Sequence, residues 1–289
     1  MKKEGGLRTK GQFNKKSETG SPLISIITPV RNGDKYLEQT IQSVLAQTYD
    51  NIEYIIVDGA STDGTLDIIR KYESQIAYWV SEPDEGPNDA GNKGVNIASG
   101  DYALYLCADD YLYCDSSIEN LLRLGLDQGT YPLLIAGRAR FALNNELLNW
   151  VMPISESNMH KYGPHCEATL ISSTIYKNIF NNTLFRATGD THFWGTLRQR
   201  GLFQVRYVDI IVSVFRLGGI TNNTKTEYYK CVEHEISRYM HYGDFSVIRL
   251  INSFARASIK KVLLRIMGES RYYRYILYNI YRFRRDFLR

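Results

Sequence analysis

The feature that most limits how this chain can fold is a regular alternation of apolar runs and helical segments up to residue 106. Short apolar runs predict buried strands at 23–30, 54–57, 76–80 and 102–106. The spacing of apolar residues between them predicts helices over 34–48, 66–72 and 88–99. Such alternation indicates an α/β fold whose mostly parallel sheet has helices on both faces. Ligands of these sheets bind at the carboxyl ends of the strands.

The chain is long enough for one large domain and an appendage, with 289 residues of which 44% are hydrophobic. Polar, non-periodic residues 1–21 predict a disordered tail. We expect a main domain over 22–226, divided into 22–115 and 116–226, although strand and helix signals mix after about residue 131. Residues 227–289 indicate a helical extension rich in Tyr and Arg.

Charge is distributed unevenly along the chain although the net charge is only +4. Residues 1–20 carry six Lys or Arg against two Glu, and 255–289 carry ten against two acids. The residues between them are acidic, with 19 basic and 27 acidic side chains. This distribution disfavours nucleic acid as a partner and favours a local anionic contact near the C-terminus.

Cysteine usage and hydropathy indicate a cytoplasmic protein. The four cysteines form no CxxC pair and have no zinc-type spacing with the five histidines, so we expect reduced thiols. No apolar run reaches the ~18 residues of a membrane span. Residues 1–20 lack the apolar core of a signal peptide, and we therefore expect a protein that is neither spanning nor secreted.

The first group with chemical potential follows the first two strands. It comprises the segment Thr28, Pro29, Val30, Arg31 and Asn32, together with Asp58. Proline fixes the backbone at a strand end, a loop can then offer its polar groups to a flat base, and a carboxylate can accept from an imino N–H. Two ordinary strand-to-helix turns are the alternative interpretation, since Asn-Gly and Asp-Gly suit turns anywhere.

The second group, Cys107-Ala108-Asp109-Asp110, follows the strand predicted at 102–106. Adjacent carboxylates repel one another unless a cation or several donors compensate, and hard divalent ions prefer oxygen ligands. Asp109 and Asp110 are therefore predicted ligands of Mn²⁺ or Mg²⁺, which would neutralise a diphosphate leaving group. A solvated acidic loop is the alternative.

Several segments in order and spacing resemble family 2 glycosyltransferases. They are 24–32, 56–65, 79–86 and 89–94, with a late element at 217–221, so that the resemblance covers 22 to about 221. The likeness is strongest to the branch found in bacterial capsule, exopolysaccharide and lipopolysaccharide gene clusters.

The resemblance implies a GT-A, Rossmann-like fold and inverting transfer from a nucleotide-diphosphate sugar, with uridine favoured, to a glycan or lipid-linked acceptor. Residues 22–115 would form the nucleotide-sugar half and 116–226 the acceptor half. Carried over by motif, Pro29 and Arg31 line the base pocket, Asp58 contacts the base and Asp109 binds the metal. Ala108, Asp89 and Lys93 lie near the donor.

Two positions depart from the family pattern. The first residue of the expected Asp-x-Asp is Cys107, and an arginine expected before Asn-x-Gly is Gly91. These departures leave a second hypothesis open, a non-catalytic glycosyltransferase-like scaffold or binding protein.

In the acceptor half, the resemblance suggests Asp190 as the general base, which an inverting transfer needs opposite the diphosphate. Its position before an apolar segment also suits a helix N-cap, and the two roles are compatible. Glu167 and Asp209 are the next candidates for the base. His165, His192 and Trp194 are further candidates for acceptor contacts, although each also suits a packing role. Metal-ligand spacing on one helix face is lacking in a later group, which we interpret as solvated or structural: Glu233, His234, Glu235 and His241.

The C-terminal segment combines apolar residues with basic ones over 247–267. Basic amphipathic helices can lie on an anionic leaflet, so we expect possible peripheral contact with the inner face of the cell membrane. A helix pair packed on the catalytic domain with a solvated basic face is the alternative.

Overall fold

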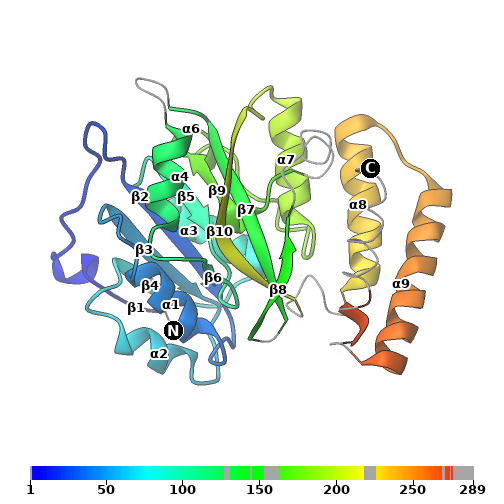
Figure 1. The fold of residues 1–289 in the computed structure, drawn as a ribbon, viewed down its shortest axis with the longest axis horizontal. Helices are drawn as coiled ribbons and strands as arrows, with labels where there is room; N and C mark the ends of the chain where they lie inside the picture. Colours follow the sequence, from blue (N-terminus) through cyan, green and yellow to red (C-terminus); the bar gives the residue numbers. More distant parts are fainter. Residues whose placement is uncertain are drawn as a thin grey trace.

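The structure, a computed structural model, describes residues 2–126, 131–143, 145–152, 163–217, 226–268, 271–273 and 275. Within these residues a ten-stranded mixed sheet has the order β1-β4-β3-β2-β5-β9-β7-β10-β6, and β8 pairs with β7 (Figure 1). The strands are β1 (Lys3–Gly5), β2 (Ile24–Val30), β3 (Ile52–Asp58), β4 (Tyr78–Ser81), β5 (Tyr102–Tyr105), β6 (Tyr111–Leu112), β7 (Leu134–Leu143), β8 (Glu146–Val151), β9 (Thr169–Ser172) and β10 (Val205–Leu217).

The first half of the sheet is the parallel unit that the sequence predicts. Strands β4, β3, β2 and β5 lie side by side in parallel. The helices that connect them are α1 (Leu37–Leu45), α2 (Thr65–Lys71) and α3 (Pro87–Ile97). The parallel arrangement brings the ends of β2, β3 and β5 to one edge of the sheet, where the predicted site residues lie.

Apolar side chains on both faces of the sheet explain why these strands read as continuous hydrophobic runs. Ile26 packs on one face in a cluster with residues of α1, α2 and α4 (Ser117–Gly125). Its neighbour Ile27 points to the opposite face, where residues of α3, α6 (Ser173–Tyr176) and α7 (Gly189–Gln199) pack.

The second half of the sheet mixes strand directions. Strand β7 runs parallel to β10 but antiparallel to β8 and β9. Strand β9 in turn pairs antiparallel with β5 and so joins the two halves. This pairing places the short 3-10 helix η2 (Cys166–Ala168), immediately before β9, beside the carboxyl end of β5.

The N-terminal residues differ from the predicted disordered tail. Strand β1 pairs antiparallel with β4, and the 3-10 helix η1 (Arg8–Lys10) follows it. The Arg8 guanidinium forms an ion pair with the buried carboxylate of Glu53 on β3 and donates to the Ile97 carbonyl at 2.8 Å. Polar composition concealed this order because a buried acid on another strand supplies the partner.

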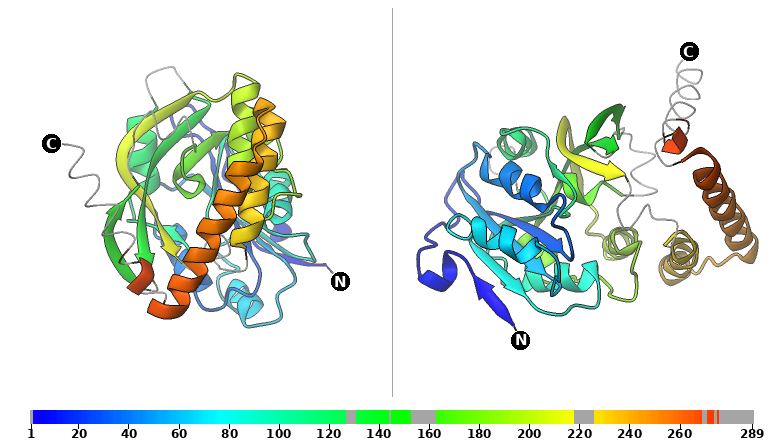
Figure 2. Two further views of the ribbon diagram at one scale, coloured as in Figure 1. Left: turned by 90° about the vertical axis from the view of Figure 1, so that its right-hand side faces the viewer. Right: turned by 90° about the horizontal axis from the view of Figure 1, so that it is seen from below.

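Helices α8 (Glu227–Tyr242) and α9 (Val247–Met267) form the C-terminal extension. Helix α8 lies against α7, and α9 lies on the outer side of α8 (Figure 2). Beyond α9, Tyr272 and Tyr273 pack with the β7–β8 hairpin. No helix in the described part of the chain has the length and apolarity needed to cross a membrane.

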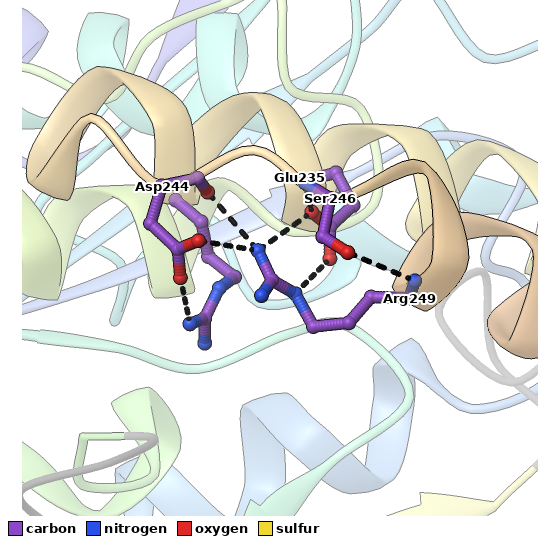
Figure 3. Close-up of polar contacts among 5 residues, drawn as sticks. Glu235, Asp244, Ser246 and Arg249 are labelled. Carbon is purple, nitrogen blue, oxygen red and sulfur yellow. Dashed lines mark hydrogen bonds and ion pairs between the residues drawn. The ribbon is translucent and has the colours of Figure 1, made fainter.

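A buried carboxylate organises the junction between α8 and α9. Glu235 of α8 accepts hydrogen bonds from the Arg249 Nε at 3.0 Å and from the Ser246 N–H at 3.1 Å. Asp244 also accepts from Arg249, at 2.9 Å, and the Ser246 hydroxyl accepts from the Arg249 N–H to cap α9 (Figure 3). These contacts fix the turn between the two helices.

Candidate active site

The loops that follow β2 and β3 are joined by hydrogen bonds. Asn32 adopts a left-handed backbone with φ of 52° and accepts from the Thr62 N–H at 2.9 Å. Its own N–H donates to the Ser61 hydroxyl at 2.8 Å. Asp58 is fully buried at the end of β3 and accepts from the Ser81 hydroxyl at 2.6 Å and from the Ser61 N–H at 3.1 Å. The two predicted base-binding loops therefore form one rigid unit.

The remaining residues of the first motif occupy different environments. The Thr28 side chain is buried, and its hydroxyl lies 3.2 Å from the Tyr54 hydroxyl. Val30 is also buried, whereas Pro29 is partly exposed and Arg31 is exposed. Only Pro29 and Arg31 of these four thus present side chains that a nucleotide could reach.

Asp89 and Lys93 lie four residues apart on α3 and are paired with each other at 3.2 Å. Lys93 also donates to the Pro83 carbonyl at 2.8 Å. Asp84, in the loop before α3, has a raised pKa because burial outweighs the opposing influences of the Gly86 N–H, Lys93 and Arg31. These mixed charges line the segment between β4 and α3, next to Gly59.

The acidic loop after β5 is held firmly by its surroundings. The Thr40 hydroxyl of α1 lies within hydrogen-bond distance of the carbonyl oxygens of Ala108 (2.9 Å) and Asp110 (2.6 Å). The Asp110 carboxylate is buried and accepts from the Arg216 N–H of β10 at 2.8 Å. The Arg216 guanidinium also donates to the Asp109 carbonyl. The loop is therefore fixed from both α1 and β10.

A cluster capable of binding a cation includes this loop. Among the described residues, potential ligand atoms of Cys107, Asp110 and Glu167 lie within 4.8 Å of one another. The second carboxylate oxygen of Asp110 is buried and has no hydrogen-bond partner. Burial and the nearby Asp109 and Glu167 charges raise the pKa of Asp110 well above its ordinary range. An unpartnered oxygen among several acids fits a hard divalent ion.

Asp109, the predicted principal metal ligand, is partly exposed beside this cluster rather than within it. Burial is the main cause of its raised pKa, and the Glu167 charge adds to it. Burial likewise raises the pKa of the Cys107 thiol well above its usual value, which indicates a neutral thiol rather than a thiolate. The Cys107 Sγ donates to Glu167 at 3.4 Å.

Glu167 on η2 forms an ion pair with His165, with 2.5 Å between Oε2 and Nδ1. Burial alone would raise the pKa of this carboxyl, but the His165 charge and hydrogen bonds from His165 and Cys166 lower the pKa to about 2. The pKa of His165 is raised by the same partner against the effect of burial. Each member of the pair therefore favours the charged form of the other.

Asp190 lies in the first turn of α7 and accepts from the Thr191 N–H at 2.7 Å. Thr188, not Asp190, occupies the N-cap position, so the predicted capping role does not apply. Asp190 is exposed to solvent. Nearby protein atoms nevertheless displace part of the water around its carboxylate, and this desolvation raises its pKa. Charges on Glu167, His165 and His234 also act on it.

Two residues considered as acceptor contacts are packed inside the protein. Trp194 is 1% exposed, beneath Gly163, and belongs to the core cluster of α7. His192 stacks on Phe185, with 4.2 Å between ring centroids, and its Nδ1 lies 3.1 Å from His241 Nε2. Trp194 and His192 are therefore part of the protein interior. His165, the third candidate, lies beside the buried Glu167.

The fold brings to this region several residues for which the sequence predicted no role in the site. Arg216 comes from β10, and Lys230, Glu233 and His234 come from α8, which runs past the N-terminus of α7. These residues lie far from the motifs in the sequence, so no local sequence pattern indicates that they approach the site. The late element at 217–221 lies outside the described residues after Leu217.

Solved structures with this arrangement of sheet and helices bind nucleotide sugars. S. aureus TarS 1–349, solved in complex with UDP-GlcNAc, matches with a TM-score of 0.59 and 16% identity over 81% of this chain and 71% of that one. The mannosyltransferase PcManGT from Pyrobaculum calidifontis, in complex with GDP-Man and Mn²⁺, also gives 0.59, at 15% identity over 90% of this chain and 79% of that one. The fold is that of the GT-A glycosyltransferases, which confirms the predicted fold class.

Sequence comparison gives the family. The model of glycosyl transferase family 2 matches residues 25–203, and the chain belongs to this family. Relatives include the putative teichuronic acid biosynthesis glycosyltransferase TuaG of Bacillus subtilis, 44% identical over 92 residues (31% of this chain, 36% of the relative). Glycosyltransferase GlyA of Streptococcus pneumoniae is 27% identical over 195 residues (65% of this chain, 26% of the relative). The matches thus span about a third or less of these relatives.

Proposed function

We propose that this protein transfers a sugar, with inversion, from a nucleotide-diphosphate donor to an acceptor hydroxyl during assembly of a bacterial surface polysaccharide. The observation that carries the proposal is the coincidence of two features at one edge of the sheet. An acidic loop with an unpartnered buried carboxylate oxygen lies there, and the exposed Asp190 carboxylate is close enough to be influenced by the same Glu167. Transfer needs one carboxylate group that holds a cation at the donor diphosphate and another that accepts the proton of the acceptor hydroxyl.

The donor would bind across the joined loops after β2 and β3. Pro29 and Arg31 are accessible, and the buried Asp58 fixes the loop that would receive the base. The UDP-GlcNAc and GDP-Man complexes of the structural neighbours support a nucleotide sugar as donor, and we favour a UDP-sugar. The acceptor would be a glycan or a lipid-linked glycan, in keeping with the teichuronic acid name of one relative.

The acidic loop would hold Mn²⁺ or Mg²⁺ through Asp109 and Asp110, with Glu167 close by. A bound divalent cation would supply charge neutralisation for the diphosphate. The Mn²⁺ in one neighbour's complex supports such a requirement. Arg216 would keep the loop in place through its bonds to Asp109 and Asp110.

Asp190 would accept the proton of the acceptor hydroxyl as it attacks the anomeric carbon. Its exposed carboxylate is reachable by an acceptor, and its raised pKa brings it closer to the pH at which a general base is effective. Asp190 lies in the first turn of α7, where the positive end of the helix dipole would favour the ionised carboxylate.

A ligand panel tests the donor assignment. We expect UDP, with Mn²⁺ or Mg²⁺ present, to raise the melting temperature more than other nucleoside diphosphates, and chelation to remove this shift. UDP release from a matching UDP-sugar should then depend on the acceptor. Nucleotide binding without turnover of any UDP-, dTDP- or GDP-sugar would favour the non-catalytic alternative that Cys107 and Gly91 suggest.

We also propose peripheral contact with the inner face of the cell membrane through α9. The helix has an exposed aliphatic stripe opposite its buried Ala257, formed by Ile248, Ile251, Ile259, Val262 and Ile266, which are 55–74% exposed. The same helix has five Lys or Arg and no acid. Arg249 and Lys260 form ion pairs with acids outside the helix, so the net charge that α9 presents comes mainly from Arg256, Lys261 and Arg265. Such a charge would repel a second copy of the helix and attract an anionic leaflet.

Vesicle binding tests this contact. Binding to vesicles with anionic phosphatidylglycerol should exceed binding to neutral phosphatidylcholine vesicles and should weaken in Ile259→Asn and Lys261→Glu. Lys177→Glu, an equal charge change on α6's exposed end, should bind like the parent. The proposal would be contradicted if all three variants bound anionic vesicles equally well, or if the protein formed a dimer through α9 in solution.

A further inference from the structure

Glu233 of α8 is buried beneath the segment that leads into α7, with 8% of its surface exposed. One carboxylate oxygen accepts from the Arg186 N–H at 2.8 Å. The other accepts from the N–H groups of Ala187 at 3.0 Å and Thr188 at 2.9 Å, and from the Thr188 hydroxyl at 3.0 Å. Four donors from three consecutive residues therefore converge on a single side chain.

These bonds determine where α7 begins. Thr188 is the N-cap residue of α7 and makes no capping bond with its side chain, because its hydroxyl is directed to Glu233. Asp190 follows two residues later, in the first helical turn. A carboxylate that accepts three successive N–H groups fixes the backbone of all three residues, since charge-assisted hydrogen bonds are short and strong. The position of Asp190 thus depends on a side chain from the C-terminal extension.

We propose that Glu233 is a positioning residue for sugar transfer, which makes α8 a working part of the active site. The inference rests on the proposed role of Asp190 as general base. Glu233 does not contact the acceptor or the donor; it holds the start of α7 so that the Asp190 carboxylate meets the acceptor hydroxyl. Small displacements of a catalytic group strongly reduce rates, which gives this contact a kinetic consequence.

The chain offers a matched control on the same helix. Glu235 is equally buried, at 5% exposure, and its carboxylate also accepts several hydrogen bonds. Two residues correspond to about 200° around a helix, so Glu233 and Glu235 face opposite sides of α8. Within the described part of the chain, Glu235 accepts its hydrogen bonds from Ser246 and Arg249 at the α8–α9 turn (Figure 3). Its replacement reproduces the loss of a buried charge without moving Asp190.

Steady-state kinetics of Glu233→Gln and Glu235→Gln separate positioning from stability. In Glu233→Gln one oxygen becomes an NH₂ group, which cannot accept from the backbone, so we expect kcat for transfer to fall about 10-fold to 100-fold. Binding of UDP with Mn²⁺ should stay parental because the donor loops are untouched. Glu235→Gln should melt earlier but keep the parental kcat. Parental kcat in folded Glu233→Gln, or an equal loss in Glu235→Gln, would overturn the inference.

A double-mutant cycle with Asp190→Asn supplies the readout that a merely structural role would not give. If Glu233 acts through Asp190, Glu233→Gln should cause no further loss of transfer once Asp190 is asparagine. If the double variant instead shows the product of the two single losses, the inference would be overturned. Parental transfer by Asp190→Asn alone would instead overturn the proposed base itself. If Glu233→Gln does not fold, Thr188→Val is the alternative variant, because it removes only the hydroxyl donor to Glu233. We expect kcat to fall by a smaller factor while UDP binding persists. An unchanged kcat would contradict the inference.

Discussion

At the level of single residues, the two adjacent aspartates of the acidic loop have different surroundings. One Asp110 oxygen accepts from the Arg216 N–H, while the other is buried without a partner. Asp109 is more exposed, and the Arg216 guanidinium donates to its backbone carbonyl. In the proposed site Asp109 would thus bind the cation, whereas Asp110 would bind it and also fixes the loop through Arg216.

We predict that Asp109→Asn and Asp110→Asn each weaken Mn²⁺ binding in the presence of UDP by more than about 10-fold, because an amide is a poorer ligand for a hard cation than a carboxylate. Asparagine at 110 can still accept from the Arg216 N–H, so the protein should remain folded. Calorimetric Mn²⁺ titration measures the effect. Asp115→Asn, in an exposed position shortly after the loop, is the control and should bind Mn²⁺ like the parent. Parental affinity in both loop variants would place the metal elsewhere.

The sequence could predict Asp58, Asp109 and Asp110 as candidate site residues because they lie at the end of, or shortly after, a recognisable strand. It could not predict that Glu167 joins them, since this contact depends on the antiparallel pairing of β9 with β5. The sequence likewise predicted no role in the site for Glu233, which was interpreted as solvated or structural. Its partners are backbone N–H groups of a distant segment, which no residue pattern reveals.

At the level of elements, β1 and η1 are integral to the domain although their composition is polar. Besides Arg8, the buried Glu53 carboxylate accepts from the Ser25 hydroxyl at 2.6 Å and the Ser99 N–H at 2.8 Å. Removing the cation would leave these neutral donors to compensate a buried charge.

We therefore predict that Arg8→Met lowers the free energy of unfolding by about 1–3 kcal/mol, less than the full loss seen for isolated buried pairs because the neutral donors remain. Lys10→Met removes an exposed pair with Glu73 at 3.2 Å and should cost less than about 1 kcal/mol. Urea unfolding of both variants measures the difference. Equal stability of the two would show that the N-terminal segment contributes little.

The interface of α7 with α8 should weaken in acid. Burial, together with the neighbouring His241, lowers the pKa of His192 to about 4 from an ordinary value of 6.5. The unfolded chain therefore binds this proton first, so stability is complete above pH 6.5 and is lost as the pH falls toward 4. We expect a loss of roughly 1 kcal/mol by pH 5.5. Melting temperatures from pH 7.5 to 5.5 should fall less for His192→Gln than for the parent; an identical slope would contradict this assignment.

Strands differ in how well their sequences predict them. The apolar runs of β2 to β5 are buried on both faces and were predicted, whereas β7 and β10 were missed. Arg138 and Arg140 interrupt β7, and Asp209 interrupts β10, where it pairs with Arg138 at 2.5 Å. These charged side chains obscure the strand pattern, although most of their neighbours in β7 are buried.

At the level of the whole molecule, the C-terminal extension is attached at two places. Helix α8 contacts α7, and Tyr272 and Tyr273 pack with the β7–β8 hairpin. The extension is therefore packed on the catalytic domain, as one interpretation of the sequence held, while α9 still presents an apolar stripe outward. Contact of that stripe with a membrane stays a proposal, and the basic stretch after residue 275 lies outside the described residues.

The central claim is that an acidic loop and Asp190 together perform inverting sugar transfer. The most direct measurement is the rate of sugar transfer by Asp190→Asn under conditions in which UDP and Mn²⁺ bind as in the parent. Asparagine cannot accept the acceptor's proton, so the rate should fall by about 10²–10⁴-fold. Thr188 provides the N-cap, so stability should change little. A folded Asp190→Asn protein that binds the nucleotide and transfers sugar at close to the parental rate would contradict the account.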